Sequence, residues 1–266
     1  MVASVRFRSG RLLDRLRLVA LDADRTPQRV ARRVAAQPSA GVLCCVYRRQ
    51  HVDRVGALAL EARGAGLTAR LWALDGAAPS LESWTVGKGP GLRQGLLNRL
   101  IPDDADGWVV LADDDVVLPE GGLARLLTIA TRIGLDVAQP GHDGASQAST
   151  PFVRARRGVG ARRTGFVEIG PVVALGPAAR SSLLPLDESL GMGWGQDYLW
   201  ARAFETDSLA AGIVDAVRMR HLPQPTRQYD YAEAARQRDD GLARAGFRSY
   251  HEPMVTYRTW QPGDLA

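Results

Sequence analysis

The stretch Trp108-Val-Val-Leu-Ala-Asp-Asp-Asp-Val-Val-Leu-Pro119 decides how the chain is expected to fold. A valine-rich apolar run leads into three consecutive aspartates, and a second apolar run follows them. An apolar run of this length, bounded by turn signals, predicts a buried strand of a parallel sheet. Ligands of open α/β sheets bind beyond the carboxyl ends of the strands, so the aspartates stand where a ligand site is expected.

Asp113, Asp114 and Asp115 are candidate ligands of a cation. Three neighbouring carboxylates repel one another unless a positive group lies between them. Mn²⁺ and Mg²⁺ take oxygen ligands, and such ions are commonly held by one or two carboxylates together with substrate phosphates. The alternative is a solvated acidic loop in which Asp113 caps the next turn.

Length and composition indicate a globular protein without a membrane span. The chain has 266 residues, of which 45% are hydrophobic and 24% charged, values ordinary for a folded domain. No window approaches eighteen uninterrupted apolar residues, and no secretory signal is visible. The adjacent Cys44 and Cys45 would point to opposite faces of a strand, which disfavours a disulfide between them. We therefore expect no transmembrane segment and a cytoplasmic location.

The net charge of +5 raises the question of a nucleic-acid partner. Arginine supplies almost all of the positive charge, because Lys88 is the only lysine. Together with the abundance of alanine and glycine, this pattern is typical of a GC-rich genome. No helix-turn-helix signature and no alternation of aromatic and basic residues accompanies it. We expect no nucleic-acid partner.

The order of apolar segments predicts an α/β domain. A strand at 41–47, a helix at 52–63 and a strand at 67–74 form a βαβ unit, whose crossover should be right-handed. Residues 77–90 and 140–165 are expected to be loops. Further helices are expected near 26–37, 91–101, 120–133, 196–204 and 232–245, and further strands near 108–113, 135–139, 166–175 and 212–219. The prediction is one Rossmann-like domain with a mostly parallel central sheet flanked by helices.

Two patterns in the second half carry further candidate chemistry. Gly193-Trp-Gly-Gln-Asp197 places a carboxylate where a helix begins, and His221 follows the last predicted strand. Each has an ordinary alternative, since Asp197 would also be favoured by the helix dipole and a single histidine is commonly a structural polar residue. The arginine-rich segment 154–163 is a candidate for closing over a diphosphate or for contacting an acidic acceptor, or is disordered.

Taken together, the three patterns resemble a glycosyltransferase of the GT-A fold. The order Asp113–Asp115, then Trp194-Gly-Gln-Asp197, then His221 is similar to that of inverting, family-2-like enzymes. Residues 166–171, 194–197 and 212–221 also look like a poorly characterised family of transferases from plants and bacteria. The resemblance covers roughly residues 41–227. It divides a single domain 1–266 into a nucleotide-binding half (41–139) and an acceptor or catalytic half (140–227), with terminal extensions at 1–40 and 228–266.

The resemblance implies a metal-dependent transfer of a sugar from a UDP- or GDP-type nucleotide-sugar donor to an acceptor hydroxyl of a small molecule, lipid or protein. Mn²⁺ or Mg²⁺ would be held by Asp113, Asp115 and His221, with Asp113 facing the ribose or a metal-bound water. Asp197 would be the general base. Because successive residues of a strand point to opposite faces, we expect Asp114 to point the other way and to tolerate substitution. The residues expected to contact the donor are Tyr47, Asp75, Lys88, Arg93, Asp113, Asp114 and Trp194.

Several points stay open at this level. A Pro-X-Tyr-Asn run is usual after the first strand of family-2 enzymes, whereas this chain has Cys45-Val-Tyr-Arg-Arg49. His142 and Asp143 are rivals for the third metal ligand. The alternatives to a glycosyltransferase are a nucleotidyltransferase of similar fold and a non-catalytic domain that binds a nucleotide or a sugar.

Overall fold

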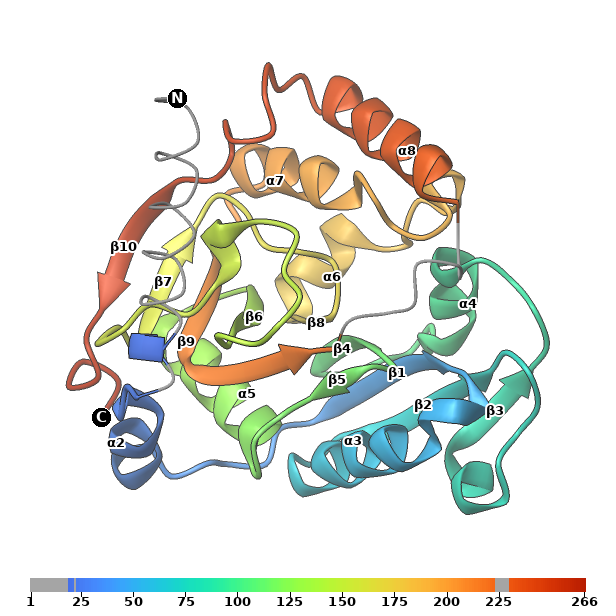
Figure 1. Ribbon diagram of the computed structural model, residues 1–266, viewed down its shortest axis with the longest axis horizontal. Helices are drawn as coiled ribbons and strands as arrows, with labels where there is room; N and C mark the ends of the chain where they lie inside the picture. The colour runs from blue at the N-terminus through green and yellow to red at the C-terminus, as the bar shows by residue number, and fades with distance from the viewer. Residues whose placement is uncertain (1–18, 22, 223–229) are drawn as a thin grey trace, which may run out of the picture.

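The computed structural model contains one ten-stranded mixed sheet with helices on both faces (Figure 1). It describes residues 19–21, 23–222 and 230–266. Strands follow one another across the sheet in the order β10-β7-β9-β6-β8-β4-β1-β2-β3, and the short β5 pairs with β9 off this path. The strands are β1 Gly41–Tyr47, β2 Thr68–Ala73, β3 Thr85–Lys88, β4 Trp108–Asp113, β5 Val116–Val117, β6 Val137–His142, β7 Ala161–Thr164, β8 Val172–Leu175, β9 Ala211–His221 and β10 Thr256–Trp260.

The helices alternate with the strands in the first half and cluster in the second. The longest are α8 and α3, and short 3₁₀ turns occur between several of the elements. The helices are α2 Thr26–Arg33, α3 Val52–Gly64, α4 Arg93–Leu100, α5 Gly122–Ile133, α6 Pro177–Leu183, α7 Gln196–Thr206 and α8 Tyr231–Arg244, and the 3₁₀ turns are η1 Arg49–His51, η2 Pro79–Trp84, η3 Pro151–Val153 and η4 Glu188–Leu190.

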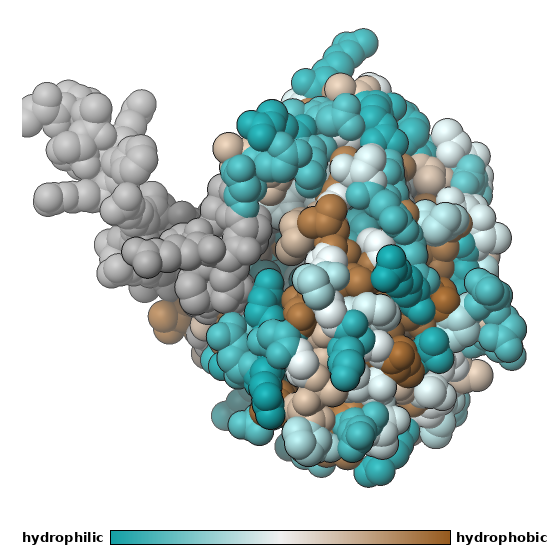
Figure 2. Space-filling model, turned by 90° about the vertical axis from the view of Figure 1, so that its right-hand side faces the viewer, coloured by the Kyte–Doolittle hydropathy of each residue, from teal (hydrophilic) through white to brown (hydrophobic). Residues whose placement is uncertain are grey.

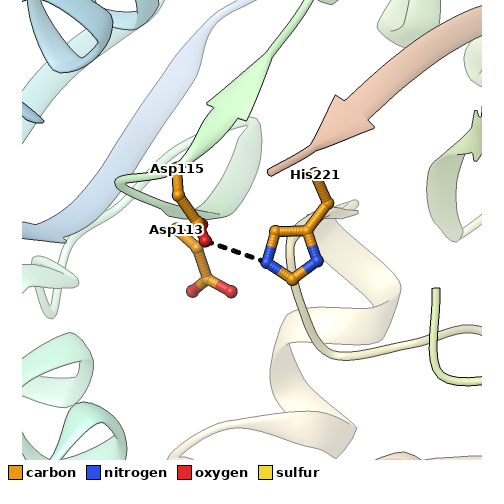
Figure 3. Close-up of side chains that lie close together, drawn as sticks. All are labelled: Asp113, Asp115 and His221. Atoms are coloured by element: carbon orange, nitrogen blue, oxygen red, sulfur yellow. Dashed lines mark ion pairs between the residues drawn. The ribbon is translucent and has the colours of Figure 1, made fainter. Parts of the chain in front are cut away.

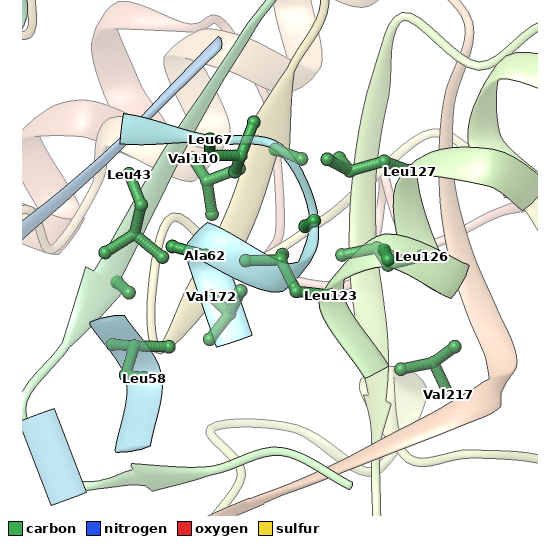
Figure 4. Packing of buried hydrophobic residues seen from close by; sticks show 14 of the residues in the cluster. Leu43, Leu58, Ala62, Leu67, Val110, Leu123, Leu126, Leu127, Val172 and Val217 are labelled. Carbon is green, nitrogen blue, oxygen red and sulfur yellow. The ribbon is translucent and has the colours of Figure 1, made fainter. Parts of the chain in front are cut away.

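Successive side chains of β1 and β4 point to opposite faces of the sheet, and both faces are covered by helices. Leu43 of β1 and Val110 of β4 pack with α2, α3 and α5 on one face, in the cluster that Figure 4 shows. Val42 and Val109 pack with α4, α6 and α7 on the other face. Strands covered on both sides are continuously apolar, which is why the sequence pattern at these positions identified them.

The direction of the strands brings several carboxyl ends to the same edge. The neighbouring strands β4, β1, β2 and β3 all run parallel to one another, and β6 is parallel to β9. β8 is antiparallel to both β4 and β6, so β4, β6 and β9 point the same way. The predicted parallel arrangement is therefore confirmed around β1, but the sheet as a whole is mixed because β7 and β8 run in the opposite direction.

Three segments differ from the sequence-based expectation. Residues 77–90, expected to be a loop, contain η2 and the edge strand β3. β3 lies on the side of the molecule that faces the viewer in Figure 2, where hydrophobic and hydrophilic residues are mixed. Within 140–165, β6 continues to His142 and β7 begins at Ala161. The expected terminal extension 228–266 supplies α8 and joins the sheet through β10. Of the other expected extension, 1–40, residues 1–18 and 22 lie outside the described residues, and the rest contains α2, whose Val30 packs in the core.

A buried ion pair fixes part of the segment that was expected to be a mobile arginine loop. The side chains of Arg162 and Asp215 are both 0% exposed, and Arg162 Nε lies 2.9 Å from Asp215 Oδ2. Arg162 also donates to the carbonyl oxygens of Phe152 and Arg154, each at 3.0 Å. Arg162 is thus a structural residue and is not available to a diphosphate or an acidic acceptor.

Asp215→Ala should lower the free energy of unfolding by about 3–5 kcal/mol, because it leaves the Arg162 charge buried without its partner. Urea unfolding followed by circular dichroism measures the loss. Glu205→Ala, which removes the half-exposed ion pair with Arg202, is the control and should change stability little. A loss below about 1 kcal/mol for Asp215→Ala would contradict this assignment.

Candidate functional site

A cleft of about 590 Å³ opens at the carboxyl edge of the sheet. Its walls come from the end of β4, the loop 147–151 after β6, the segment 166–171 before β8, the glycine-rich turn 192–195, Arg238 in the middle of α8, and the segment 250–254. Segments from both halves of the chain and from its C-terminal part therefore meet at one place. Most of the titratable residues selected from the sequence line this cleft.

Asp113, Asp115 and His221 converge in the cleft (Figure 3). One ligand atom from each of them lies within 4.8 Å of the others. The pairing of β5 with β9 explains the convergence, because Val116 stands opposite His221 in this antiparallel ladder. The backbone N–H of Leu222 also donates to the carbonyl oxygen of Asp115 at 3.0 Å. The turn after β4 and the end of β9 are thereby held together.

The electrostatics of His221 are set by Asp115. Its Nε2 lies 3.1 Å from Asp115 Oδ2, and its Nδ1 lies 3.0 Å from the carbonyl oxygen of Gln147. A carbonyl oxygen only accepts, so Nδ1 carries a proton and Nε2 is the nitrogen directed at Asp115. Burial by itself lowers the pKa of His221, but the hydrogen bond and charge of Asp115 outweigh it and raise this pKa to about 9.

The donor set fits a six-coordinate divalent cation. Neighbouring ligands of an octahedral Mg²⁺ or Mn²⁺ with bonds of about 2.1 Å lie about 3 Å apart, which is the separation of His221 Nε2 from Asp115 Oδ2, 3.1 Å. The carbonyl of Gln147 fixes the ring orientation and the tautomer, as outer partners of metal-binding histidines do. Two carboxylates and one imidazole suit Mn²⁺ as well as Mg²⁺.

Asp113 is oriented by Arg93, the first residue of α4. Arg93 Nε donates to Asp113 Oδ1 at 2.7 Å, and its guanidinium is almost fully buried. Gly170 lies against the same carboxylate, since a Cβ at that position would approach Asp113 Oδ2 to 2.7 Å. Arg93 and Gly170 therefore fix the orientation of the Asp113 carboxylate.

The carboxylate of Asp114 contacts residues other than Asp113, Asp115 and His221, and it is largely buried. Its Oδ2 accepts from the backbone N–H of Arg48 at 2.8 Å and lies 3.0 Å from His51 Nδ1. The side chain is only 6% exposed, and burial raises the pKa of its carboxyl group. In place of the tolerance expected from the sequence, we expect substitution of Asp114 to be destabilising, because it removes the acceptor of the Arg48 N–H and the ion-pair partner of His51.

Asp197 stands in the first turn of α7, preceded by a turn that requires glycine. Gly193 and Gly195 have φ of +97° and +98°, and a Cβ on Gly195 would approach the carbonyl oxygen of Gln237 in α8 to 2.6 Å. Burial of the Asp197 carboxyl raises its pKa to about 7, and the charge of Glu168 adds to the rise. The backbone N–H groups of Asp197 and Gly195 and the charge of Arg93 oppose it. A carboxyl group with this pKa is suited to general-base chemistry near neutral pH.

Not every residue selected from the sequence reaches the cleft. Arg93, Asp113, Asp114, Asp115, Trp194, Asp197 and His221 line it, whereas Tyr47, Asp75 and Lys88 do not. Tyr47 is fully buried, and its hydroxyl bonds Thr85 Oγ1 and the backbone N–H of Ala78, so the expected nucleotide contact is wrong. Asp75 accepts from the N–H of Arg49, and Lys88 is exposed on the edge strand β3.

The two rival metal ligands have other partners. His142 is fully buried, with Nε2 2.8 Å from Glu168 Oε2 and Nδ1 2.7 Å from Ser146 Oγ. Asp143 Oδ2 lies 2.7 Å from the guanidinium of Arg220. His221 is thus the histidine that joins Asp113 and Asp115.

Sequence reasoning missed several residues of the cleft. Glu168 lies in a segment that carried the family resemblance, but it received no role. Arg238, Tyr250, His251 and Met254 lie in the region treated as an extension, where no motif marks them. Their position becomes apparent only once α8 is packed against α7.

Comparisons with known proteins support the fold. No protein-family model matches the chain, and no curated protein matches it by sequence. The solved structure described as "Crystal structure of GalNAc-T7 with UDP, GalNAc and Mn2+" is similar with a TM-score of 0.55 at 10% sequence identity. The similarity covers 79% of this chain and 48% of that one, so this chain spans about half the length of its neighbour. The likeness shows a GT-A-like α/β fold.

Among the described residues, no helix combines the length and the apolar character needed to cross a bilayer. Cys44 and Cys45 are both buried and free.

Binding of Mn²⁺ should strengthen about tenfold for each pH unit between pH 6.5 and 8, because the metal displaces the His221 proton, whose pKa is about 9. Calorimetric titration in buffers of different ionisation enthalpy counts the released proton. Asp143→Asn is the matched control and should bind like the wild type, whereas His221→Ala should bind weakly and lose the pH dependence. Affinity independent of pH, with no proton released, would contradict the assignment.

Asp197→Asn should raise the melting temperature at pH 8 and leave it nearly unchanged at pH 4. The folded-state pKa of Asp197, about 7, is above its unfolded value of 3.8, so the wild type loses stability as the pH rises from about 4 to about 7. Thermal unfolding at both pH values measures the difference. An equal effect at the two values would show that Asp197 does not titrate in this range.

Proposed function

We propose that this protein is a metal-dependent glycosyltransferase that moves a sugar from a nucleotide-sugar to an acceptor hydroxyl. The observation that carries the proposal is the meeting of Asp113, Asp115 and His221 with Asp197 in one cleft at the carboxyl edge of a GT-A-like sheet. The neighbour's crystal structure contains UDP, GalNAc and Mn²⁺, which supports a nucleotide-sugar donor of the UDP or GDP type. The finer likeness to family-2-like enzymes and the cytoplasmic location stay predictions.

Asp113, Asp115 and His221 would hold Mn²⁺ or Mg²⁺. A bound divalent ion supplies Lewis-acid stabilisation of the charge that develops on a diphosphate leaving group. Neighbouring residues fix the orientation of two of these side chains. Arg93 orients Asp113, and the carbonyl of Gln147 orients His221. Arg93 and Arg48 line the same cleft and can pair with phosphate oxygens.

Asp197 would act as the general base. Its ionised carboxylate takes the proton of the acceptor hydroxyl while that oxygen attacks the anomeric carbon, and a base of this kind contributes about 10²–10⁴-fold in rate. Direct attack by the acceptor inverts the anomeric configuration. Trp194 lines the cleft three residues before Asp197 and would form an apolar wall for a sugar or acceptor.

Incubation with a panel of nucleotide-sugars and Mn²⁺ should release a nucleoside diphosphate from one donor. The release should require the metal and stop with a chelator. Release of pyrophosphate would favour a nucleotidyltransferase, and binding without any release would favour a non-catalytic domain. Either result would contradict the proposal.

Asp115→Ala and Asp197→Ala should each lower kcat at least about 100-fold while the folded structure persists. Asp207→Ala, at the exposed carboxyl end of α7, is the matched control and should retain full activity. Nuclear magnetic resonance of the product should show an anomeric configuration opposite to that of the donor. Retained configuration, or near-normal turnover of Asp197→Ala, would refute Asp197 as the base of an inverting reaction.

A further inference from the structure

Glu168 is a further carboxylate in the cleft, and Ser149 and His142 hold it in place. Its Oε1 accepts from the backbone N–H of Ser149 at 3.0 Å and from the Ser149 hydroxyl. Its Oε2 lies 2.8 Å from Nε2 of His142. The side chain is 7% exposed and lines the same cleft as Asp197. Two hydrogen bonds from Ser149 and the close approach of His142 fix the position of this carboxylate.

A series of buried polar contacts connects Glu168 to the end of β9. The first is the close approach of His142 Nε2 to Glu168 Oε2, at 2.8 Å. The Nδ1 of the same ring is hydrogen-bonded to the hydroxyl of Ser146, at 2.7 Å. The Ser146 oxygen in turn accepts from the backbone N–H of His221 at 2.9 Å. These contacts join Glu168 through His142 and Ser146 to the end of β9 and hold the Glu168 carboxylate in place.

Packing brings Glu168 to the side of the cleft where α7 begins. Phe166, two residues before Glu168, contacts Tyr198, the residue after Asp197, with ring centroids 5.6 Å apart. Phe166, Glu168, Asp197 and Tyr198 all line the cleft. Two carboxylates from different elements thus line the same part of the cleft, and like charges at a partly buried site interact more strongly than in water.

We infer that Glu168 is a positioning residue of the proposed transfer reaction: as a fixed negative charge on the cleft wall, it makes Asp197 a stronger proton acceptor. This inference rests on the proposed role of Asp197 as base. Glu168 exchanges no proton itself. Its charge makes the ionised form of Asp197 less stable, so that Asp197 takes a proton from an acceptor hydroxyl more readily.

Other groups around Asp197 act in both directions. Arg93 of α4 and the N–H groups of Gly195 and Asp197 favour its ionised form, whereas burial and Glu168 favour its protonated form, and the balance gives a pKa of about 7. Tyr198 lies beside Asp197 on α7, and Arg238 of α8 and His251 line the same cleft. The charge of Glu168 raises the pKa of Asp197, and the charge of Arg93 lowers it.

The test is a titration of Asp197 by ¹³C nuclear magnetic resonance of its carboxyl carbon, assigned from the spectrum of Asp197→Asn. Glu168→Gln removes the charge and retains the shape, and should lower the titration midpoint by roughly one pH unit. Ser149→Ala is the matched control, because it removes one donor to Glu168 but keeps the charge, and its midpoint should equal that of the wild type. If Glu168→Gln does not fold, Glu168→Met replaces it with the same expected shift.

An unchanged midpoint in the neutral variants would overturn the inference and leave Glu168 as an anchor for loop 147–151. The titration uses no substrate, so its outcome is independent of whether the protein transfers sugar. Where transfer is observed, the acid limb of the kcat profile should shift to lower pH in Glu168→Gln and stay in place in Ser149→Ala. A uniform loss of kcat without this shift would also overturn the inference.

Discussion

Three consecutive carboxylates at the end of β4 are the constraint on which the rest of this structure depends. Asp113, Asp114 and Asp115 can lie side by side only if each has its own positive or donating partner. Arg93 meets Asp113, the Arg48 N–H and His51 meet Asp114, and His221 meets Asp115. The partners come from α4, from the loop after β1 and from the end of β9, so three separate elements contact this turn.

Two features of the sheet supply that convergence. The parallel β1–β4 ladder sets Val46 opposite Asp113, which places the loop after β1 beside the aspartates. β9 is long enough to pair with β6 and then with β5 on the far side of the turn. A shorter β9 would leave Asp115 without His221. The metal cluster is therefore a consequence of strand register, and the buried Arg162–Asp215 pair stabilises the part of β9 that leads to it.

The parts of the fold that could be predicted are those where one local pattern decides the structure. Gly41–Tyr47 and Trp108–Asp113 are apolar because both faces of each strand are covered, and that signal is visible in the sequence. The edge strands β3 and β10 are short and half exposed, so no such pattern marks them. Buried arginines are equally hidden, because Arg162 has the same sequence signature as the exposed Arg163.

The site divides in the same way. Asp113, Asp115, Asp197 and His221 lie next to strand ends or helix starts, where backbone direction alone decides which residues meet. Tyr47 also follows this rule, but the pleat turns its ring into the core under η2, and only the three-dimensional packing reveals this. Glu168 and His142 pair across 26 residues of sequence. No local motif indicates that contact.

The most direct measurement of the central claim is anomalous diffraction from crystals soaked with Mn²⁺ and UDP. The account predicts one strong manganese peak bounded by the carboxylates of Asp113 and Asp115 and by Nε2 of His221, with the diphosphate on its open side. A manganese peak elsewhere, or UDP bound in the cleft without metal between it and these three side chains, would contradict the account.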